Sequence, residues 1–148
     1  MEIEDIKIIT SSDQARIWDE TIEGALYERI LSEASMEHTF EKLSAYAVLN
    51  YTPVLIGGII VKVHLNTLWI DAIWVAHIFR KKGIGSRLLN QATKFAIESN
   101  CTSIQLNTYF KDSFRFFEHN GFQEVACIPN WKYNLDCYFL SKICIDPL

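Results

Sequence analysis

The stretch that decides the fold runs from position 69 to position 89 and reads Trp69-Ile70-Asp71-Ala72-Ile73-Trp74-Val75-Ala76-His77-Ile78-Phe79-Arg80-Lys81-Lys82-Gly83-Ile84-Gly85-Ser86-Arg87-Leu88-Leu89. Its pattern predicts a buried strand, a short basic turn with two glycines, and the start of an amphipathic helix. A helix N-terminus presents unpaired N–H groups and the positive end of the helix dipole, and glycine lets a ligand approach the backbone closely. Because Arg80, Lys81 and Lys82 add positive charge at the same place, the stretch predicts an anion-binding site.

Two phosphate-binding loops with known patterns do not fit this stretch. A Walker A loop needs Gly-Lys-Ser/Thr at a set spacing, which the stretch lacks. The dinucleotide fingerprint needs a third glycine where the chain has Leu88. What remains, Arg80-x-x-Gly83-x-Gly85 between a strand and a helix, resembles the acyl-CoA pyrophosphate loop of the GNAT superfamily of N-acetyltransferases, Gln/Arg-x-x-Gly-x-Gly/Ala. The alternative is a glycine-rich turn that only ends a strand.

The resemblance extends over positions 43 to 145. It includes the Leu68-Trp69-Ile70-Asp71 strand before the loop, the helix after it, and then a strand, a short helix and Asn120-Gly121-Phe122. The resemblance implies an α/β fold, a GNAT-like sandwich with a mixed, mostly antiparallel sheet and helices on both faces. It further implies a single N-acetyltransferase domain over residues 1–148, with acetyl-CoA as co-substrate.

The composition bounds the class of protein. The chain has 148 residues, enough for one domain with a sizeable core. A net charge of −4 disfavours nucleic acid as a partner. No apolar run is long enough to span a membrane, and the acidic start at residues 1–5 does not resemble a signal peptide. The four cysteines show no Cys-x-x-Cys spacing, so we expect reduced thiols in a cytoplasmic protein without a bound metal.

The rest of the chain predicts elements on both sides of the loop. Before it we expect an edge strand at 6–9, N-caps at 11–13, a helix at 14–35 that Gly24 divides, strands at 45–49 and 54–65, and a tight hairpin at 66–67 into a strand at 68–75. After it we expect a helix at 85–99, a parallel strand at 103–109, a short helix capped by Asp112, and strands at 122–128 and 135–145 around an irregular loop at 129–134.

The GNAT resemblance assigns the residues that bind acetyl-CoA. In the family, the strand before the loop splays away from the next strand, and its backbone pairs with pantetheine; by position these residues are Ile73, Trp74 and Val75. One N–H there faces the thioester carbonyl, which stabilises the oxyanion. The resemblance adds the pyrophosphate loop and two later positions: Arg80, Lys81, Lys82, Gly83, Ile84, Gly85, Ser86, Asn107 and Phe116. Ile73 and Val75 can also pack in the core, because the groups that would bind the cofactor belong to the backbone.

A base is needed because an alkyl ammonium has a pKa near ~10.4 and must lose a proton before it can attack. Asp71 alternates with Ile73 and Val75 on the same strand and could take the proton directly or through water. A structural aspartate near a bulge is the alternative interpretation. His64 and His77 are rival candidates, although a lone histidine is more often structural or exposed.

The acid is where the chain departs from the family. Many GNAT enzymes place a tyrosine four residues before the Gly-Phe dipeptide, and here that residue is Phe117. Tyr109, at the end of its strand, could replace it, or could be an aromatic residue at the rim. A thiol with a pKa of ~8.5 is also a fair leaving group without an acid.

These residues together predict an acetyl-CoA-dependent N-acetyltransferase that acts by direct attack in a ternary complex. The acceptor is expected to be a primary amine of a small molecule or a peptide, and a homodimer is left open. By family position, the acceptor side includes Trp18, Tyr27, Trp131 and Tyr133, although the spacing of Trp18 also fits a helix core. The alternative function is a non-catalytic acyl-CoA-binding or sensing module, which the loss of tyrosine at position 117 would suit.

Overall fold

The computed structural model describes residues 15–34, 40–49 and 52–144. The chain divides into two compact units, Met1–His38 and Thr39–Leu148. In the first unit, α1 (Ala15–Ala34) confirms the predicted helix. The predicted break at Gly24 is wrong, because the helix continues through it: a glycine inside a helix costs only about 1 kcal/mol relative to alanine. The predicted edge strand at 6–9 and the N-caps at 11–13 lie outside the described residues.

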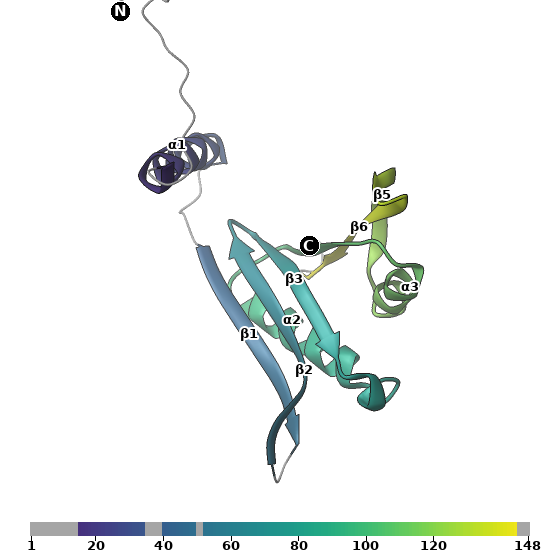
Figure 1. The fold of residues 1–148 in the computed structure, drawn as a ribbon. Helices are drawn as coiled ribbons and strands as arrows, with labels where there is room; N and C mark the ends of the chain where they lie inside the picture. The colour runs from purple at the N-terminus through teal and green to yellow at the C-terminus, as the bar shows by residue number, and fades with distance from the viewer. Residues whose placement is uncertain (1–14, 35–39, 50–51, 145–148) are drawn as a thin grey trace, which may run out of the picture. The chain divides into compact units, whose positions relative to one another are not determined.

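The second unit contains a mixed sheet of six strands in the order β1-β2-β3-β4-β6-β5 (Figure 1). β3 and β4 pair in parallel, and every other neighbouring pair is antiparallel. The predicted mixed, mostly antiparallel sheet is therefore confirmed. The strands are β1 (Phe40–Leu49), β2 (Thr52–His64), β3 (Thr67–Val75), β4 (Ser103–Thr108), β5 (Gln123–Lys132) and β6 (Leu135–Ile143).

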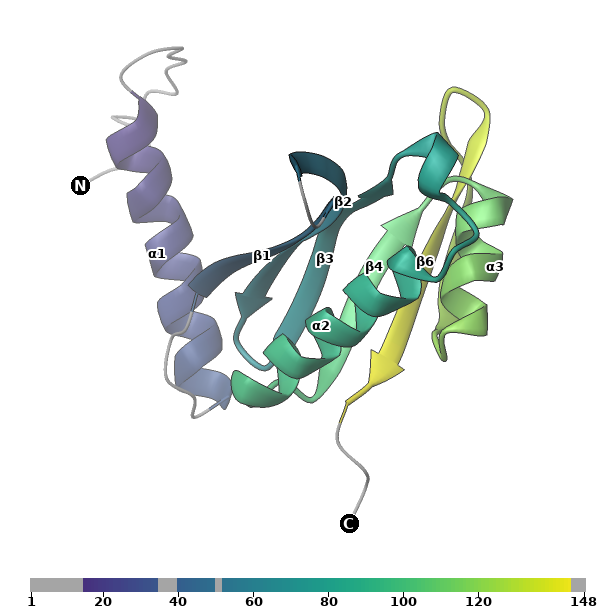
Figure 2. The same ribbon diagram turned by 90° about the horizontal axis from the view of Figure 1, so that it is seen from below.

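Two helices lie against one face of this sheet (Figure 2). α2 (Ile84–Glu98) connects the parallel strands β3 and β4 and buries one apolar side, formed by Leu88, Leu89, Ala92 and Ala96. α3 (Lys111–His119) follows β4 and buries Phe117 in the same core. A short 3-10 helix, η2 (His77–Phe79), leads from β3 towards α2. Because α2 and α3 share a face, the prediction of helices on both faces is not tested within this unit.

The first half of β1 is absent from the sequence prediction, which began the strand at residue 45. The strand starts at Phe40 and pairs with β2 from Phe40↔His64 to Leu49↔Thr52. Glu41 and Lys42 are both exposed on this edge strand, so the segment lacks the apolar alternation that marks a strand. Pairing with the long β2 provides the extra length.

The irregular loop predicted at 129–134 is confirmed only in its irregularity: the register shifts between Ile128 and Lys132, and Asn130 has φ 52°, but β5 continues to Lys132. A two-residue turn then joins β5 to β6, with Lys132 paired to Leu135. Both turn residues, Tyr133 (φ 51°) and Asn134 (φ 60°), are left-handed, as in a type I′ hairpin turn. Pro129 and a turn without glycine concealed this hairpin from the sequence.

The end of α3 confirms the predicted stop at Asn120-Gly121. Gly121 has φ 91°, and the Phe122 N–H donates to the Phe117 carbonyl at 3.1 Å, as in a Schellman motif. The start of α3 differs from the prediction, because Phe110 is the N-cap residue and Asp112 lies inside the first turn. No helix among the described residues is both long and apolar enough to cross a membrane.

Candidate active site

The two parallel strands at the centre of the sheet separate soon after they begin. β3 and β4 pair only at Thr67↔Ser103, Leu68↔Ile104 and Trp69↔Gln105 among the described residues. Beyond Trp69, β3 remains paired with β2 on its other side as far as Val75. The edge of β3 that faces β4 therefore has no strand partner over 70–75, and we call the space that it borders the opening. Backbone N–H and C=O groups along such an edge can pair with an extended ligand.

A β-bulge lies where the opening begins. On β2 the neighbours Ile60 and Val61 pair with Ala72 and Ile70, so Asp71 is the extra residue on β3. A bulge bends its strand and re-aims the side chain at the extra position. The bulge therefore explains both the departure of β3 from β4 and the exposed position of the Asp71 carboxylate.

Asp71 forms an ion pair with a lysine of the neighbouring strand. Lys62 Nζ lies 2.7 Å from Asp71 Oδ2, and both side chains are partly exposed. Val61 and Val63, on either side of Lys62, are buried in the core that α2 covers. Since side chains alternate along a strand, Lys62 points to the opposite face of the sheet. The pair Lys62–Asp71 thus lies on the face that α2 and α3 leave open.

The loop after β3 is held in place by its own backbone and by one arginine. The Ala76 N–H donates to the Ile56 carbonyl at 2.8 Å. Arg80 Nε donates to the Val75 carbonyl at 2.9 Å, which ties the loop back to the end of the strand. Arg80 has further guanidinium N–H groups, and the described residues supply no other hydrogen-bond partner for them. Lys81 has φ 58°, so the chain turns sharply here before α2 begins.

The N-terminus of α2 has the features of an anion site. Gly83 is its N-cap with φ 82°, and α2 has no side-chain cap and no acidic residue in its first turn. The first helical hydrogen bond that closes on the cap runs from the Arg87 N–H to the Gly83 carbonyl at 3.1 Å. The N–H groups of Ile84, Gly85 and Ser86 have no intrahelical acceptor. The positive end of the helix dipole lies at these groups, and the cations of residues 80–82 come directly before them in the chain, with Lys82 Nζ 5.7 Å from the centroid of the Phe79 ring.

Gly85 has a second reason to be glycine besides approach of a ligand. A Cβ built on Gly85 would lie 2.9 Å from Cζ of Phe116, a distance that real Cβ atoms do not reach. The ring of Phe116 on α3 therefore packs directly on the first turn of α2. Because of this contact, the Phe116 ring lies beside the candidate anion site, next to the predicted loop at residues 80–86.

The strand after α2 ends at a small pocket of about 370 Å³. Tyr109, directly after β4, lines it together with residues of α3 and of the β5–β6 hairpin: Phe110, Lys111, Asp112, Asn134, Leu135, Asp136 and Tyr138. Loss of solvent raises the pKa of Tyr138, and the Asp136 carboxylate raises it further. Since β3 and β4 are parallel, their carboxyl ends, and hence Val75 and Tyr109, lie towards the same edge of the sheet.

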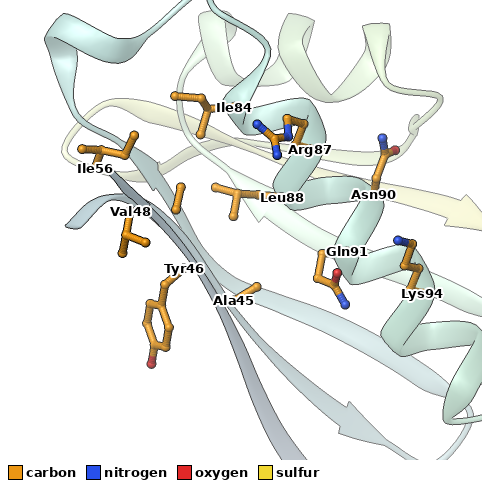
Figure 3. A pocket seen from close by; sticks show the side chains of 11 residues that line it. Ala45, Tyr46, Val48, Ile56, Ile84, Arg87, Leu88, Asn90, Gln91 and Lys94 are labelled. Atoms are coloured by element: carbon orange, nitrogen blue, oxygen red, sulfur yellow. The ribbon is translucent and has the colours of Figure 1, made fainter. Parts of the chain in front are cut away.

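A larger groove of about 580 Å³ lies between α2 and the strands β1 and β2. Figure 3 shows Arg87, Gln91 and Lys94 on α2 across from Val48 and Ile56. The groove begins at Ile84 and Arg87, in the first turn of α2, so it is contiguous with the anion site. Its floor is apolar and its α2 side carries two cations.

The other sequence candidates are scattered. Asn107 Nδ2 lies 3.6 Å from Cys137 Sγ, and His77 is exposed in η2. His64 pairs with Thr67 beside the β2–β3 turn, at the far end of β3 from the loop. Phe117, the residue at the family's tyrosine position, is buried between the rings of Phe116 and Phe122. The remaining candidates are Trp18 and Tyr27 in α1 of the first unit, Trp131 in β5 with its ring at a right angle to Phe139, and the exposed turn residue Tyr133.

Sequence reasoning missed Lys62. A usable signal exists, because Val61-Lys62-Val63 alternates and so places the lysine on the open face. The hairpin at 65–66 then sets it opposite Trp69. Within the part of the chain that the structure describes, no group of three His, Cys, Asp or Glu side chains could hold a metal ion.

Comparisons with known proteins agree on one family. The model of the acetyltransferase (GNAT) family matches residues 11–122. A blasticidin-S acetyltransferase of Streptomyces morookaense is 30% identical over 89 residues, which are 60% of this chain and 65% of that protein. The match thus spans less than two thirds of that relative's length.

Solved structures give the same fold. An acetyltransferase from Bacillus cereus ATCC 14579 superposes with a TM-score of 0.80 at 23% identity, covering 93% of this chain and 97% of that one. An acetyltransferase from Bacillus anthracis strain Ames, in complex with acetyl coenzyme A, gives a TM-score of 0.63 at 25% identity and covers 69% and 62%. These similarities confirm the fold that the sequence predicted.

Proposed function

Because the chain belongs to the GNAT acetyltransferase family, we propose that it is an acetyl-CoA-dependent N-acetyltransferase. It moves an acetyl group to a primary amine of a small molecule or a peptide, by direct attack in a ternary complex. The observation that supports this best is the opening between β3 and β4, which leads to the uncapped N-terminus of α2. An unpaired strand edge that ends at an anion site suits a ligand with a long amide-bearing arm and a pyrophosphate.

The described residues fit such a co-substrate. The open edge at Ile73, Trp74 and Val75 offers backbone groups to the pantetheine amides. The N–H groups of the first α2 turn, with the cations at 80–82, would take the pyrophosphate. Asn107 on β4 and Phe116 on α3 would contact the same ligand beside the opening. Acetyl-CoA supplies an activated thioester, and the protein's part is to orient it and exclude water.

Proton removal is assigned to Asp71. The incoming amine arrives mainly as an ammonium ion and must lose a proton to expose its lone pair. The Asp71 carboxylate is exposed on the open face, at the bulge where β3 leaves β4. Its oxygen Oδ2 is paired with Lys62, so an incoming amine, or a water that bridges to it, would compete with that lysine for the carboxylate.

Proton delivery to sulfur is assigned to Tyr109. Its phenol lies at the end of β4, at the edge of the sheet where β3 also ends. The buried ring of Phe117 carries no proton to give. A thiolate can also leave unassisted, so Tyr109 would accelerate the reaction without being required.

The acceptor side is proposed to include the β5–β6 hairpin. Trp131 keeps a partly exposed face beside Phe139, and Asp136 places a carboxylate near the pocket of Tyr109. Such a surface suits a cationic acceptor. The relative named for blasticidin-S makes that compound a first candidate to test.

We further propose one domain over residues 1–148, acting in the cytoplasm with reduced thiols, since the four cysteines are free.

The test combines binding with turnover. Calorimetry should detect acetyl-CoA binding, and a thiol reagent should detect free CoA released in the presence of primary amines, blasticidin-S among them. If acetyl-CoA binds but no amine in the panel causes thiol release, the alternative function, a non-catalytic acyl-CoA-binding or sensing module, is favoured over the enzyme. Absence of binding would reject both functions.

A further inference from the structure

The candidate base already has a primary amine beside it. Lys62 Nζ, 2.7 Å from Asp71 Oδ2, is within hydrogen-bond distance of the carboxylate. The acceptor of the proposed reaction is also a primary amine, and it must bring its nitrogen to the same carboxylate. Lys62 therefore occupies, chemically, the position of the acceptor.

Lys62 also lies level with the start of the opening. It pairs across the hairpin with Trp69, which is the last residue of β3 that pairs with β4. Its side chain reaches forward to Asp71, on the part of β3 that borders the opening. The Lys62 side chain is 41% exposed, and among the described residues Asp71 is its one ion-pair partner.

We propose that Lys62 is a self-acetylation site, modified by the protein's own bound acetyl-CoA when no acceptor is present. The inference rests on the proposed function, because it uses the same base and the same thioester. Asp71 would hold the Lys62 nitrogen at the mouth of the opening and take its proton, as it does for an external amine. An acceptor would then compete with Lys62 for Asp71.

The step balances without a further reactant. The Lys62 ammonium gives one proton to Asp71, and the freed nitrogen lone pair attacks the thioester carbon. A C–N bond forms, the C–S bond breaks, and the sulfur leaves as a thiolate. The nitrogen loses a second proton as the amide forms. One of the two protons returns to the thiolate, and the other goes to solvent, leaving acetyl-lysine and free CoA.

The chain offers a matched control lysine. Lys42 on β1 pairs directly with Lys62, so both side chains project on the same face of the sheet. Lys42 is exposed, and among the described residues it has no ion pair. Chemical acetylation by acetyl-CoA alone would favour the more exposed Lys42. Acetylation directed by Asp71 would favour Lys62.

The experiment uses the full chain, deuterated acetyl-CoA and no acceptor, with peptide mass spectrometry over time. We expect the label at Lys62 to accumulate about 10²-fold faster than at Lys42, the lower end of the range for one acid–base group. Asp71→Asn should reduce labelling of Lys62 to the rate of Lys42. Lys62→Arg keeps a cation beside Asp71 and should lose this label, while its acetyl-CoA affinity and its circular dichroism spectrum stay as in the wild type.

The result also separates this inference from the proposed function. Equal rates at Lys62 and Lys42, in a protein that acetylates an external amine, would overturn self-acetylation and leave the enzyme assignment intact. Equal rates together with no turnover and no binding would remove the proposed function as well. Faster labelling of Lys62 that an added acceptor slows in proportion to its own turnover would support both.

Discussion

The two strands that border the opening, β3 and β4, differ in regularity and in charge. β4 pairs with β6 from Ser103 to Thr108 without a shift in register. β3 has a bulge at Asp71 and continues into a loop with three cations. The pocket at the end of β4 has two carboxylates instead, Asp112 and Asp136, and one cation, Lys111. The bulged strand therefore leads to the cationic loop that we propose as the anion site, while the regular strand ends at a pocket lined by two carboxylates and one lysine.

The largest effect should come from blocking the β3 side at Gly85. Gly85→Val would push against the ring of Phe116 and cover the N–H groups of the first α2 turn. Loss of two charge-assisted hydrogen bonds, at about 1.5–3 kcal/mol each, predicts acetyl-CoA binding that is weaker by about 10²- to 10⁴-fold in calorimetry. Gly121→Ala, a glycine with φ 91° away from the loop, is the control for general backbone strain. Wild-type affinity in Gly85→Val would mean that the loop does not bind the pyrophosphate.

Asp71 on β3, which we propose as the base, should have the next largest effect. Asp71→Asn keeps the shape of the side chain but removes the charge, so we expect kcat to fall about 10²–10³-fold. The Kd for acetyl-CoA should change less than twofold, because the anion site is elsewhere. Glu98→Gln, an exposed carboxylate at the end of α2 away from the anion site, should leave kcat unchanged. A rate for Asp71→Asn within twofold of the wild type would make Asp71 a structural partner of Lys62 only.

The β4 side is tested by Tyr109→Phe. If its phenol protonates the leaving sulfur, kcat should fall about 10²-fold, at the lower end of the general-acid range. Tyr138→Phe removes a hydroxyl from the same pocket and should have little effect, since that phenol packs against Phe114. Equal rates in the Tyr109 variant and the wild type would show that the thiolate leaves unassisted, and the β4 side would lose its catalytic role.

A smaller effect is expected from the cations of the loop. Arg80→Ala removes the link to the Val75 carbonyl and one charge beside the pyrophosphate. We expect acetyl-CoA to bind about 10-fold more weakly, which corresponds to one charged hydrogen bond. Binding of an acetyl-pantetheine analogue without pyrophosphate should change less. An equal loss of affinity for both ligands would mean that Arg80 maintains the conformation of the loop and does not contact the pyrophosphate. Arg115→Ala, on the exposed side of α3, is the matched control.

The smallest effect should be on the reactivity of Cys127, which depends on the carboxylates near the β5–β6 hairpin. Cys127 is exposed, yet loss of solvent raises its pKa, and the carboxylates of Asp136 and Glu124 raise it further. The thiolate is the reactive form, so alkylation at neutral pH should be slow and should increase as the pH rises. Removing a charge in Asp136→Asn lowers that pKa and should accelerate alkylation about threefold at pH 8. An unchanged rate would show that Asp136 does not act on this side of the hairpin.

Much of this arrangement follows from local sequence. Arg80-x-x-Gly83-x-Gly85 predicted both the loop and the start of α2, because a strand, a glycine turn and an amphipathic helix are local patterns. The sequence did not predict the first half of β1, because an exposed edge strand carries charged residues where a buried strand carries apolar ones. It did not predict the tight β5–β6 hairpin, because Pro129 is unusual inside a strand. The ion pair of Lys62 with Asp71 was missed because it depends on a register shift between two strands. No pattern along one segment encodes such a shift.

The unpaired edge of β3 also connects the stability of the protein to metabolism. A ligand that pairs with the edge at 70–75 completes the sheet, so it binds the folded chain and not the unfolded one. By mass action, a ligand at about 100 times its Kd adds ~2.7 kcal/mol to the free energy of unfolding. The amides along this edge should then exchange with deuterium more slowly, and proteases should degrade the chain more slowly. The lifetime of this protein in a cell would follow the concentration of its own co-substrate.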